Sequence, residues 1–128
     1  MSAAIDRLLA RPDVVGLVPG DVDAFIAEGI CVLFFTGDPS RHREIDDVAA
    51  ILPELIRASG HLMKIGVIDP DRDRASAVRF AVTIRPTLVF LHNGRVLGAV
   101  ARMRDWAFYQ AEIATIFAPF ASEVSCDG

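Results

Sequence analysis

The hydrophobic positions divide the chain into alternating strand-like and helix-like segments. An unbroken apolar run over residues 30–35 is typical of a central strand that is covered on both faces. The next segment predicts one amphipathic helix, because its apolar residues fall on one face of a 3.6-residue period: Ile45, Val48, Ala49, Leu52, Leu55 and Ile56. Pro53 lies inside this stripe and cannot donate to the carbonyl of Ala49, so we expect a kink and not two separate helices.

Shorter elements flank these two. Before residue 30 the pattern predicts a short helix ending near Pro12, a strand over 14–18, and a helix capped by Asp21 and closed by Gly29. After the long helix it predicts a strand over 62–68, a turn at 69–71 and a helix to about Phe80.

The last third of the chain predicts a hairpin followed by a helix. Strands over 87–91 and 96–100 flank Asn93-Gly94, a strong two-residue turn signal, and Asp105 caps the final helix. The strands at 30–35 and 62–68 would be parallel neighbours joined by the long helix, and the hairpin would add antiparallel strands. This order predicts an α/β sandwich, with a central mixed β-sheet flanked by helices.

Length and charge narrow the class of protein. A chain of 128 residues predicts one domain over 1–128, and the sequence leaves open whether 121–128 is ordered. Seventeen acidic against thirteen basic residues give a net charge of −4, which provides no overall basic surface for nucleic acid. No apolar run is long enough to span a bilayer, and the first residues lack a signal-peptide core. We therefore expect a cytoplasmic protein without membrane insertion.

The segment over 85–96, Arg-Pro-Thr-Leu-Val-Phe-Leu-His-Asn-Gly-Arg-Val, resembles the thioredoxin superfamily, in which an X-Pro-Thr segment leads into a hairpin. The stretches 67–69 and 80–84 fit the same template. The resemblance implies a thioredoxin-like fold and a cis bond between Arg85 and Pro86. It does not extend to thioredoxin chemistry, because residues 36–47 contain no cysteine. Cys31 lies inside the predicted strand as a buried structural thiol, and Cys126 lies in the tail.

A more specific resemblance is to the HupG/HyaE type of hydrogenase expression/formation protein. It is carried by Asp-Pro-Ser-Arg at 38–41, by Glu44, and by Asp-Val-Ala-Ala-Ile-Leu-Pro-Glu-Leu at 47–55. This resemblance implies a non-catalytic chaperone in [NiFe]-hydrogenase maturation. Its partner would be the hydrogenase small-subunit precursor with its twin-arginine signal peptide, and it would need no cofactor.

Four acidic residues near the start of the long helix form a candidate partner-binding site, here called the acidic patch: Asp38, Glu44, Asp46 and Asp47. We expect the helix to begin near Arg43 or Glu44, because basic residues in a first turn oppose the helix dipole. Carboxylates beside the Arg85-Pro86-Thr87 segment would pair with guanidinium groups of a partner. The alternative is that these acids are ordinary helix-start residues that face solvent.

The sequence leaves the roles of other candidate residues open. Arg85 either completes a peptide groove or is an exposed arginine on a turn, and Thr87 is expected to bond locally. Trp106 is either an interface anchor or a core residue, whereas the helical spacing of Phe117 favours the core. The three histidines, His42, His61 and His92, show no metal-ligand spacing, so we expect no metal site.

Two other functions remain open at this point. A single-thiol oxidoreductase would use Cys31 or Cys126, and a structural docking subunit would bind without reading a signal sequence. A homodimer is also compatible with the sequence.

Overall fold

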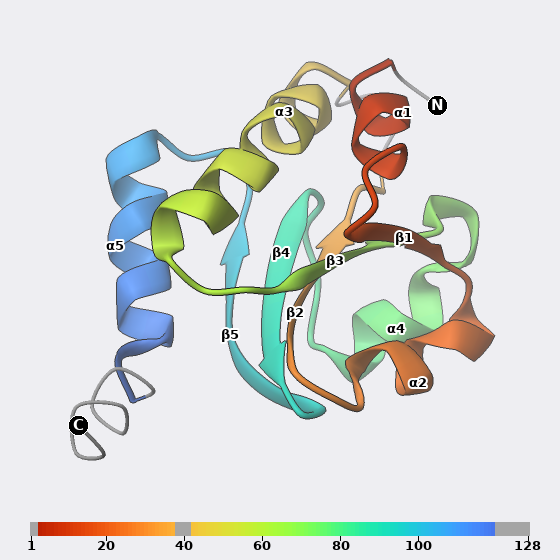
Figure 1. Ribbon diagram of the computed structural model, residues 1–128. Coiled ribbons are helices and arrows are strands. Elements are labelled where there is room, and N and C mark those ends of the chain that lie inside the picture. Colours follow the sequence, from red (N-terminus) through yellow and green to blue (C-terminus); the bar gives the residue numbers. More distant parts are fainter. Residues whose placement is uncertain (1–2, 38–41, 120–128) are drawn as a thin grey trace.

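The structure is a computed structural model that describes residues 3–37 and 42–119. Its centre is a mixed five-stranded sheet in the order β1-β3-β2-β4-β5 (Figure 1). The strands are β1 Val14–Leu17, β2 Ile30–Phe35, β3 Lys64–Ile68, β4 Thr87–His92 and β5 Arg95–Ala101. The helices are α1 Ala3–Leu9, α2 Val22–Ile26, α3 His42–Ser59, α4 Arg74–Arg79 and α5 Trp106–Ile116. Short 3₁₀ turns at Pro19–Asp21 and Pro70–Arg72 precede α2 and α4.

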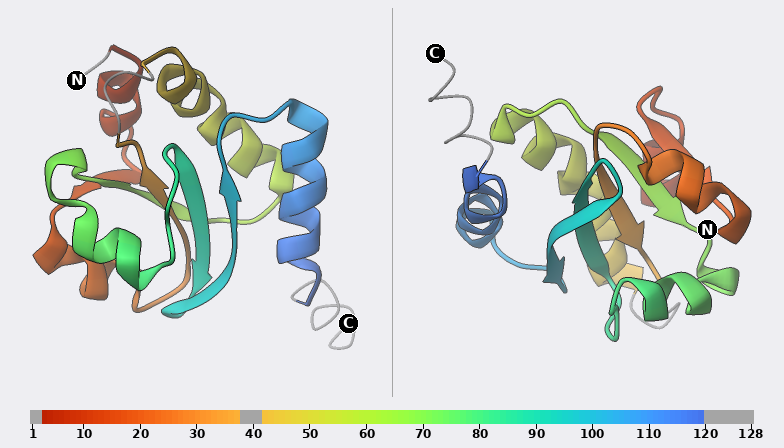
Figure 2. Two further views of the ribbon diagram at one scale, coloured as in Figure 1. Left: turned by 180° about the vertical axis from the view of Figure 1, so that it is seen from behind. Right: turned by 90° about the horizontal axis from the view of Figure 1, so that it is seen from below.

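Helices cover both faces of the sheet, as Figure 2 shows for α3 and α5 on one side and α2 and α4 on the other. Strand β2 supplies both cores, because its side chains alternate between the faces. Val32 and Phe34 join the cluster under α1, α3 and α5, whereas Cys31, Leu33 and Phe35 join the cluster under α2 and α4. The predicted sandwich with a central mixed sheet is therefore confirmed.

The main connections also agree with the sequence. Strands β2 and β3 are parallel neighbours joined by α3, which continues as one helix through Pro53. Strands β4 and β5 form the expected antiparallel hairpin, and both turn residues, Asn93 and Gly94, have the positive φ angles that this turn requires. The bond between Arg85 and Pro86 is cis, as the resemblance implied.

Three boundaries differ from the prediction. Strand β3 begins at Lys64, which pairs with Cys31, and Leu62 lies before it at 95% exposure. Helix α3 begins at His42, slightly earlier than predicted. Asp21 does not cap α2, because its carboxylate accepts a hydrogen bond from the main-chain N–H of Val18 instead.

The close packing of β3 against α2 gives a test of the fold. Replacing Gly66 by Ala would put a Cβ 2.5 Å from Cδ1 of Leu17 and 2.9 Å from Cε2 of Phe25. We expect Gly66→Ala to lower the free energy of unfolding by about 1–3 kcal/mol, because overpacking a buried site forces its neighbours to move. Gly16→Ala on β1 is the matched control, since its Cβ would meet only Cδ2 of Leu9 at an ordinary 3.6 Å. Urea unfolding of both variants checks the difference, and equal stabilities would contradict the packing.

Candidate functional site

Four segments meet at one end of the sheet. Strand β2 ends at Phe35, which pairs with Thr87 at the start of β4, and Thr87 pairs in turn with Ala101 at the end of β5. The main-chain N–H of Arg102 donates to the carbonyl of Pro86 at 2.7 Å. The start of α3 reaches the same place through Glu44. The end of β2, the start of α3, the cis-proline segment and the β5–α5 connection therefore form one site.

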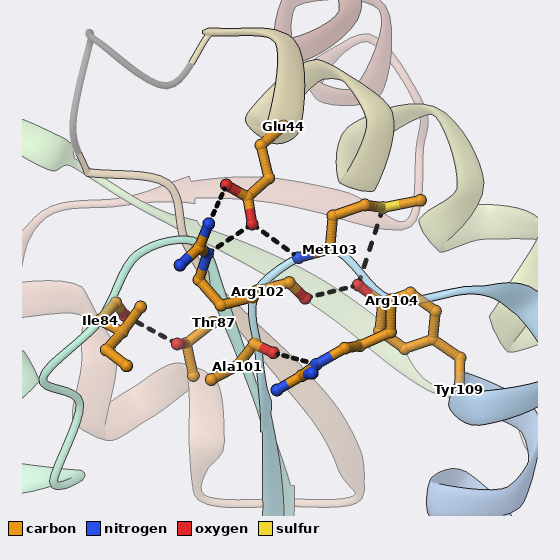
Figure 3. Close-up of polar contacts among 8 residues, drawn as sticks. All are labelled: Glu44, Ile84, Thr87, Ala101, Arg102, Met103, Arg104 and Tyr109. Atoms are coloured by element: carbon orange, nitrogen blue, oxygen red, sulfur yellow. Dashed lines mark hydrogen bonds and ion pairs between the residues drawn. The ribbon is translucent and has the colours of Figure 1, made fainter.

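Glu44 joins the start of α3 to the β5–α5 connection. Its carboxylate accepts hydrogen bonds from Nε of Arg102 at 2.6 Å, from Nη2 of Arg102 at 3.0 Å and from the main-chain N–H of Met103 at 2.9 Å (Figure 3). The Glu44 side chain is 18% exposed and that of Arg102 is 40% exposed. Hydrogen bonding to Glu44 raises the pKa of the Arg102 guanidinium above its ordinary value. A bidentate pair with an added main-chain donor holds the two segments in one geometry.

The main chain of the β5–α5 connection is fixed from the other side by Tyr109. Arg102 has a left-handed backbone with φ 71°, and its carbonyl accepts a hydrogen bond of 2.8 Å from the Tyr109 hydroxyl. Tyr109 is fully buried, and this burial raises the pKa of its phenol. The Arg102 residue is thus held by its N–H, its carbonyl and its side chain at once.

Arg85 is bound within the fold, which excludes the prediction of a solvent-exposed arginine on a turn. Its Nε lies 3.0 Å from Oδ2 of Asp73, and the two side chains are only 23% and 13% exposed. Its aliphatic part covers Gly37, where an added Cβ would lie 2.2 Å from Cγ of Arg85. With φ 61°, Gly37 is the residue type that this close approach and this backbone conformation require.

The main chain of Arg85 itself, unlike its side chain and unlike the carbonyls of Ile84 and Pro86, is unpaired in the described part of the chain. Within the described residues the N–H and C=O of Arg85 have no hydrogen-bond partner. Pro86 is buried, and the buried Thr87 hydroxyl donates to the carbonyl of Ile84 at 2.7 Å, which confirms the expected local bond. The segment is therefore fixed by its side chains and carries main-chain groups that an extended peptide could pair with.

The acidic patch is divided among several environments. Glu44 is engaged by Arg102 and Met103, and Asp47 is exposed. Asp46 is half-buried, and its Oδ1 is buried without a hydrogen-bond partner in the described part of the chain. Asp38 lies outside the described residues. Of these four residues, Glu44 is therefore the one that the structure places in contact with the β5–α5 connection.

Trp106 begins α5 and remains 41% exposed, so it is not a core residue. The Asp105 carboxylate caps this helix as predicted, accepting from the N–H of Phe108 at 2.8 Å. Phe108 is also partly exposed, and the guanidinium of Arg104 lies 5.0 Å from the centre of its ring. Phe117 is buried, as its spacing predicted.

Sequence reasoning missed Arg102 and Asp73, the two partners that fix the site. Arg102 is separated from Glu44 by 58 residues and Asp73 from Arg85 by 12. Neither pair has a local spacing rule that could have identified it. The surrounding signals, an acid in a first helical turn and an arginine before a proline, indicated only one member of each pair.

Cys31 lies away from this site, because it is four residues before the end of β2, or about 13 Å along a strand. Its side chain is fully buried, and burial raises the pKa of the thiol to about 11, with Lys64 acting in the opposite direction. A thiol that is both protonated and inaccessible is a poor nucleophile. Cys126 lies outside the described residues.

Across 3–37 and 42–119 no three His, Cys, Asp or Glu side chains converge as ligands for a metal ion. His61 is stacked on Phe117 with ring centres 4.5 Å apart. None of the helices in these ranges has the length and apolar character needed to cross a bilayer.

These features define a thioredoxin-like scaffold that has no cysteine between residues 36 and 47. The sequence model described as "Hydrogenase-1 expression protein HyaE" matches residues 4–109. The chain therefore belongs to this family of hydrogenase expression/formation proteins.

Known proteins support both assignments. The chain is 37% identical to HupG of Bradyrhizobium diazoefficiens over 84% of its own length, and 38% identical to HoxO of Cupriavidus necator over 85%. Both relatives are named hydrogenase expression/formation proteins, and the matches span 65% and 70% of their lengths.

Solved structures show the same fold. A crystal structure assigned to the hydrogenase expression/formation protein hupG from Rhodopseudomonas palustris has a TM-score of 0.56 at 34% identity, covering 84% of this chain and 97% of that one. A mutant thioredoxin from Halobacterium salinarum has a TM-score of 0.60 at 21% identity, covering 84% and 94%. The second likeness concerns the fold alone.

The Glu44 interaction gives a prediction about stability. We expect Glu44→Gln to lower the free energy of unfolding by about 1–2 kcal/mol, because hydrogen bonds to an ionised acceptor become weaker neutral ones. Asp47→Asn removes the same charge from an exposed position three residues later and should change stability by less than about 0.5 kcal/mol. Denaturant unfolding and hydrogen exchange of the Met103 amide check both variants. Unchanged Met103 protection in Glu44→Gln would show that the carboxylate does not hold the connection.

The buried thiol predicts a dependence of stability on pH. The unfolded chain loses the Cys31 proton near pH 9, whereas the folded chain retains it to about pH 11. The stability that this proton contributes is complete below pH 9 and is lost as the pH rises through 11, a change of about 2–3 kcal/mol. Comparing wild type with Cys31→Ala by urea unfolding at pH 8 and 11 isolates this contribution from other titrating groups. Parallel pH profiles would contradict the burial of Cys31.

Proposed function

We propose that the protein is a non-catalytic assembly factor in hydrogenase maturation. It binds the hydrogenase small-subunit precursor through its twin-arginine signal peptide, without forming a covalent bond. Family membership supports the pathway, since relatives are named for hydrogenase expression and formation. The proposal implies a cytoplasmic location, where the precursor still carries its signal peptide.

The proposal rests on the unpaired main chain of Arg85, at an end of the sheet where the described residues include no thiol. In the described residues its N–H and C=O lack partners, and its side chain is turned to Asp73 and Gly37. An extended peptide gains affinity by pairing with such groups, as in strand addition. Pro86 and Thr87 hold this segment in place. A binding site of this kind needs no reactive group.

Acidic and aromatic side chains provide specificity in this proposal. Glu44 and Asp47, together with Asp46 and Asp38, supply carboxylates for the two guanidinium groups of the signal peptide. Trp106 supplies a partly exposed aromatic surface for the apolar residues that follow them. The partner-binding residues are therefore those of the acidic patch with Arg85, Pro86, Thr87 and Trp106.

The single tryptophan of the chain makes binding directly measurable. We expect a synthetic small-subunit signal peptide to shift Trp106 emission to shorter wavelength and to release heat in titration calorimetry. A twin-lysine version should bind about tenfold more weakly, because lysine cannot form bidentate pairs with carboxylates. Trp106→Phe, in the same calorimetric titration, is the matched control for the aromatic contact and should retain most of the affinity.

Four outcomes would contradict the proposal. Equal affinity for both peptides would remove the role of the acidic patch, and the absence of binding by either would remove signal-peptide recognition. Unchanged binding of a precursor lacking its signal peptide would favour the structural docking subunit. Insulin reduction that is lost in Cys31→Ser or Cys126→Ser would favour the single-thiol oxidoreductase. The calorimetric stoichiometry also shows whether one copy or two bind each peptide.

A further inference from the structure

The resting structure already contains an arginine bound to the acidic patch. Glu44 holds the guanidinium of Arg102 through Nε and Nη2, in the two-point geometry that a carboxylate and an arginine prefer. The carboxylate is therefore shaped and positioned to bind a guanidinium group. In the free protein its own chain supplies that group.

We propose that Arg102 is an internal competitor that occupies Glu44 until an arginine of the partner peptide replaces it. This inference rests on the proposed function, because it assigns the peptide's arginine to the place where Arg102 is bound. In addition, the ion pair between Glu44 and Arg102 weakens the binding of any ligand that cannot displace Arg102.

The two sides of this ion pair are held unequally. Glu44 is only 18% exposed and keeps the Met103 N–H as a third donor, so its carboxylate stays in place when one partner leaves. The Arg102 side chain is 40% exposed, so it is the more solvent-accessible member of the pair and has less contact to lose on release. The main chain of Arg102 is fixed separately, by Pro86 and Tyr109. Release of the side chain therefore does not require the connection to unfold.

The exchange of one guanidinium for another keeps the charge at Glu44 constant. An isolated arginine gains little, because it must displace a competitor that is already tethered beside the carboxylate. A peptide that also pairs with the Arg85 main chain has additional contacts and can displace Arg102. Competition of this kind raises selectivity at the expense of affinity.

The variant Arg102→Gly tests this inference, because glycine readily adopts the left-handed backbone that Arg102 has in the structure. It removes the guanidinium and preserves the conformation of the connection. Arg104→Ala is the matched control, since it removes the same charge two residues away, where the side chain bonds the carbonyl of Ala101 and not Glu44.

We expect Arg102→Gly to bind the twin-arginine peptide at least about threefold more tightly than Arg104→Ala does. The apparent dissociation constant falls because the state in which Arg102 occupies Glu44 no longer exists. The gain for the twin-lysine peptide should be smaller. Affinity of Arg102→Gly equal to or below that of Arg104→Ala would overturn the inference, as would an equal gain for both peptides.

A measurement on the unaltered protein does not depend on the folding of any variant. The Nε–H proton of Arg102 should be protected from exchange with water in the free protein and lose protection when the twin-arginine peptide saturates it. If the Arg102 Nε–H stays protected while the peptide binds, Arg102 is not displaced, and the inference that it is a competitor is wrong. The proposed function would still hold. No binding of either peptide by wild type, Arg102→Gly or Arg104→Ala would overturn both.

Discussion

The site depends on one carboxylate that is satisfied by a distant part of the chain. Glu44 lies in the first turn of α3, yet its donors, Arg102 and Met103, belong to the connection between β5 and α5. This contact joins the helix that follows the central strand to the last helix of the fold. Because Arg102 also bonds Pro86 through its main chain, the same residue connects α3 to the cis-proline segment. The Glu44 carboxylate, the cis-proline segment and the start of α3 are consequently held in one arrangement.

At the same end of the sheet, the proposed peptide-binding role depends on how Arg85 is held. Arg85 and Asp73 pair beside Gly37, two residues after the end of β2, and within the described residues the main-chain N–H and C=O of Arg85 have no partner. The one described cysteine is buried in the opposite half of its strand. Sequence similarity to HupG, HoxO and HyaE proteins places the chain in the family of hydrogenase expression/formation proteins.

The fold was largely predictable because hydrophobic periodicity and turn residues act locally. The apolar run of β2, the stripe on α3 and the Asn93-Gly94 turn each indicated their element from a few neighbouring residues. The site was less predictable, because ion pairs between residues far apart in sequence leave no periodic signal. Glu44 and Arg85 were identified as candidates, but their partners Arg102 and Asp73 emerge only from the packing of α3, α4 and the β5–α5 connection.

We propose that this end of the sheet is a peptide-binding surface. Titrating the isotopically labelled protein with the twin-arginine signal peptide, and following the main-chain amide signals by NMR, tests it most directly. If the peptide binds there, the largest shifts will map to Asp47, Arg85, Thr87, Met103 and Trp106. Shifts confined to α2 and α4, or no shifts at a saturating concentration of peptide, would contradict it.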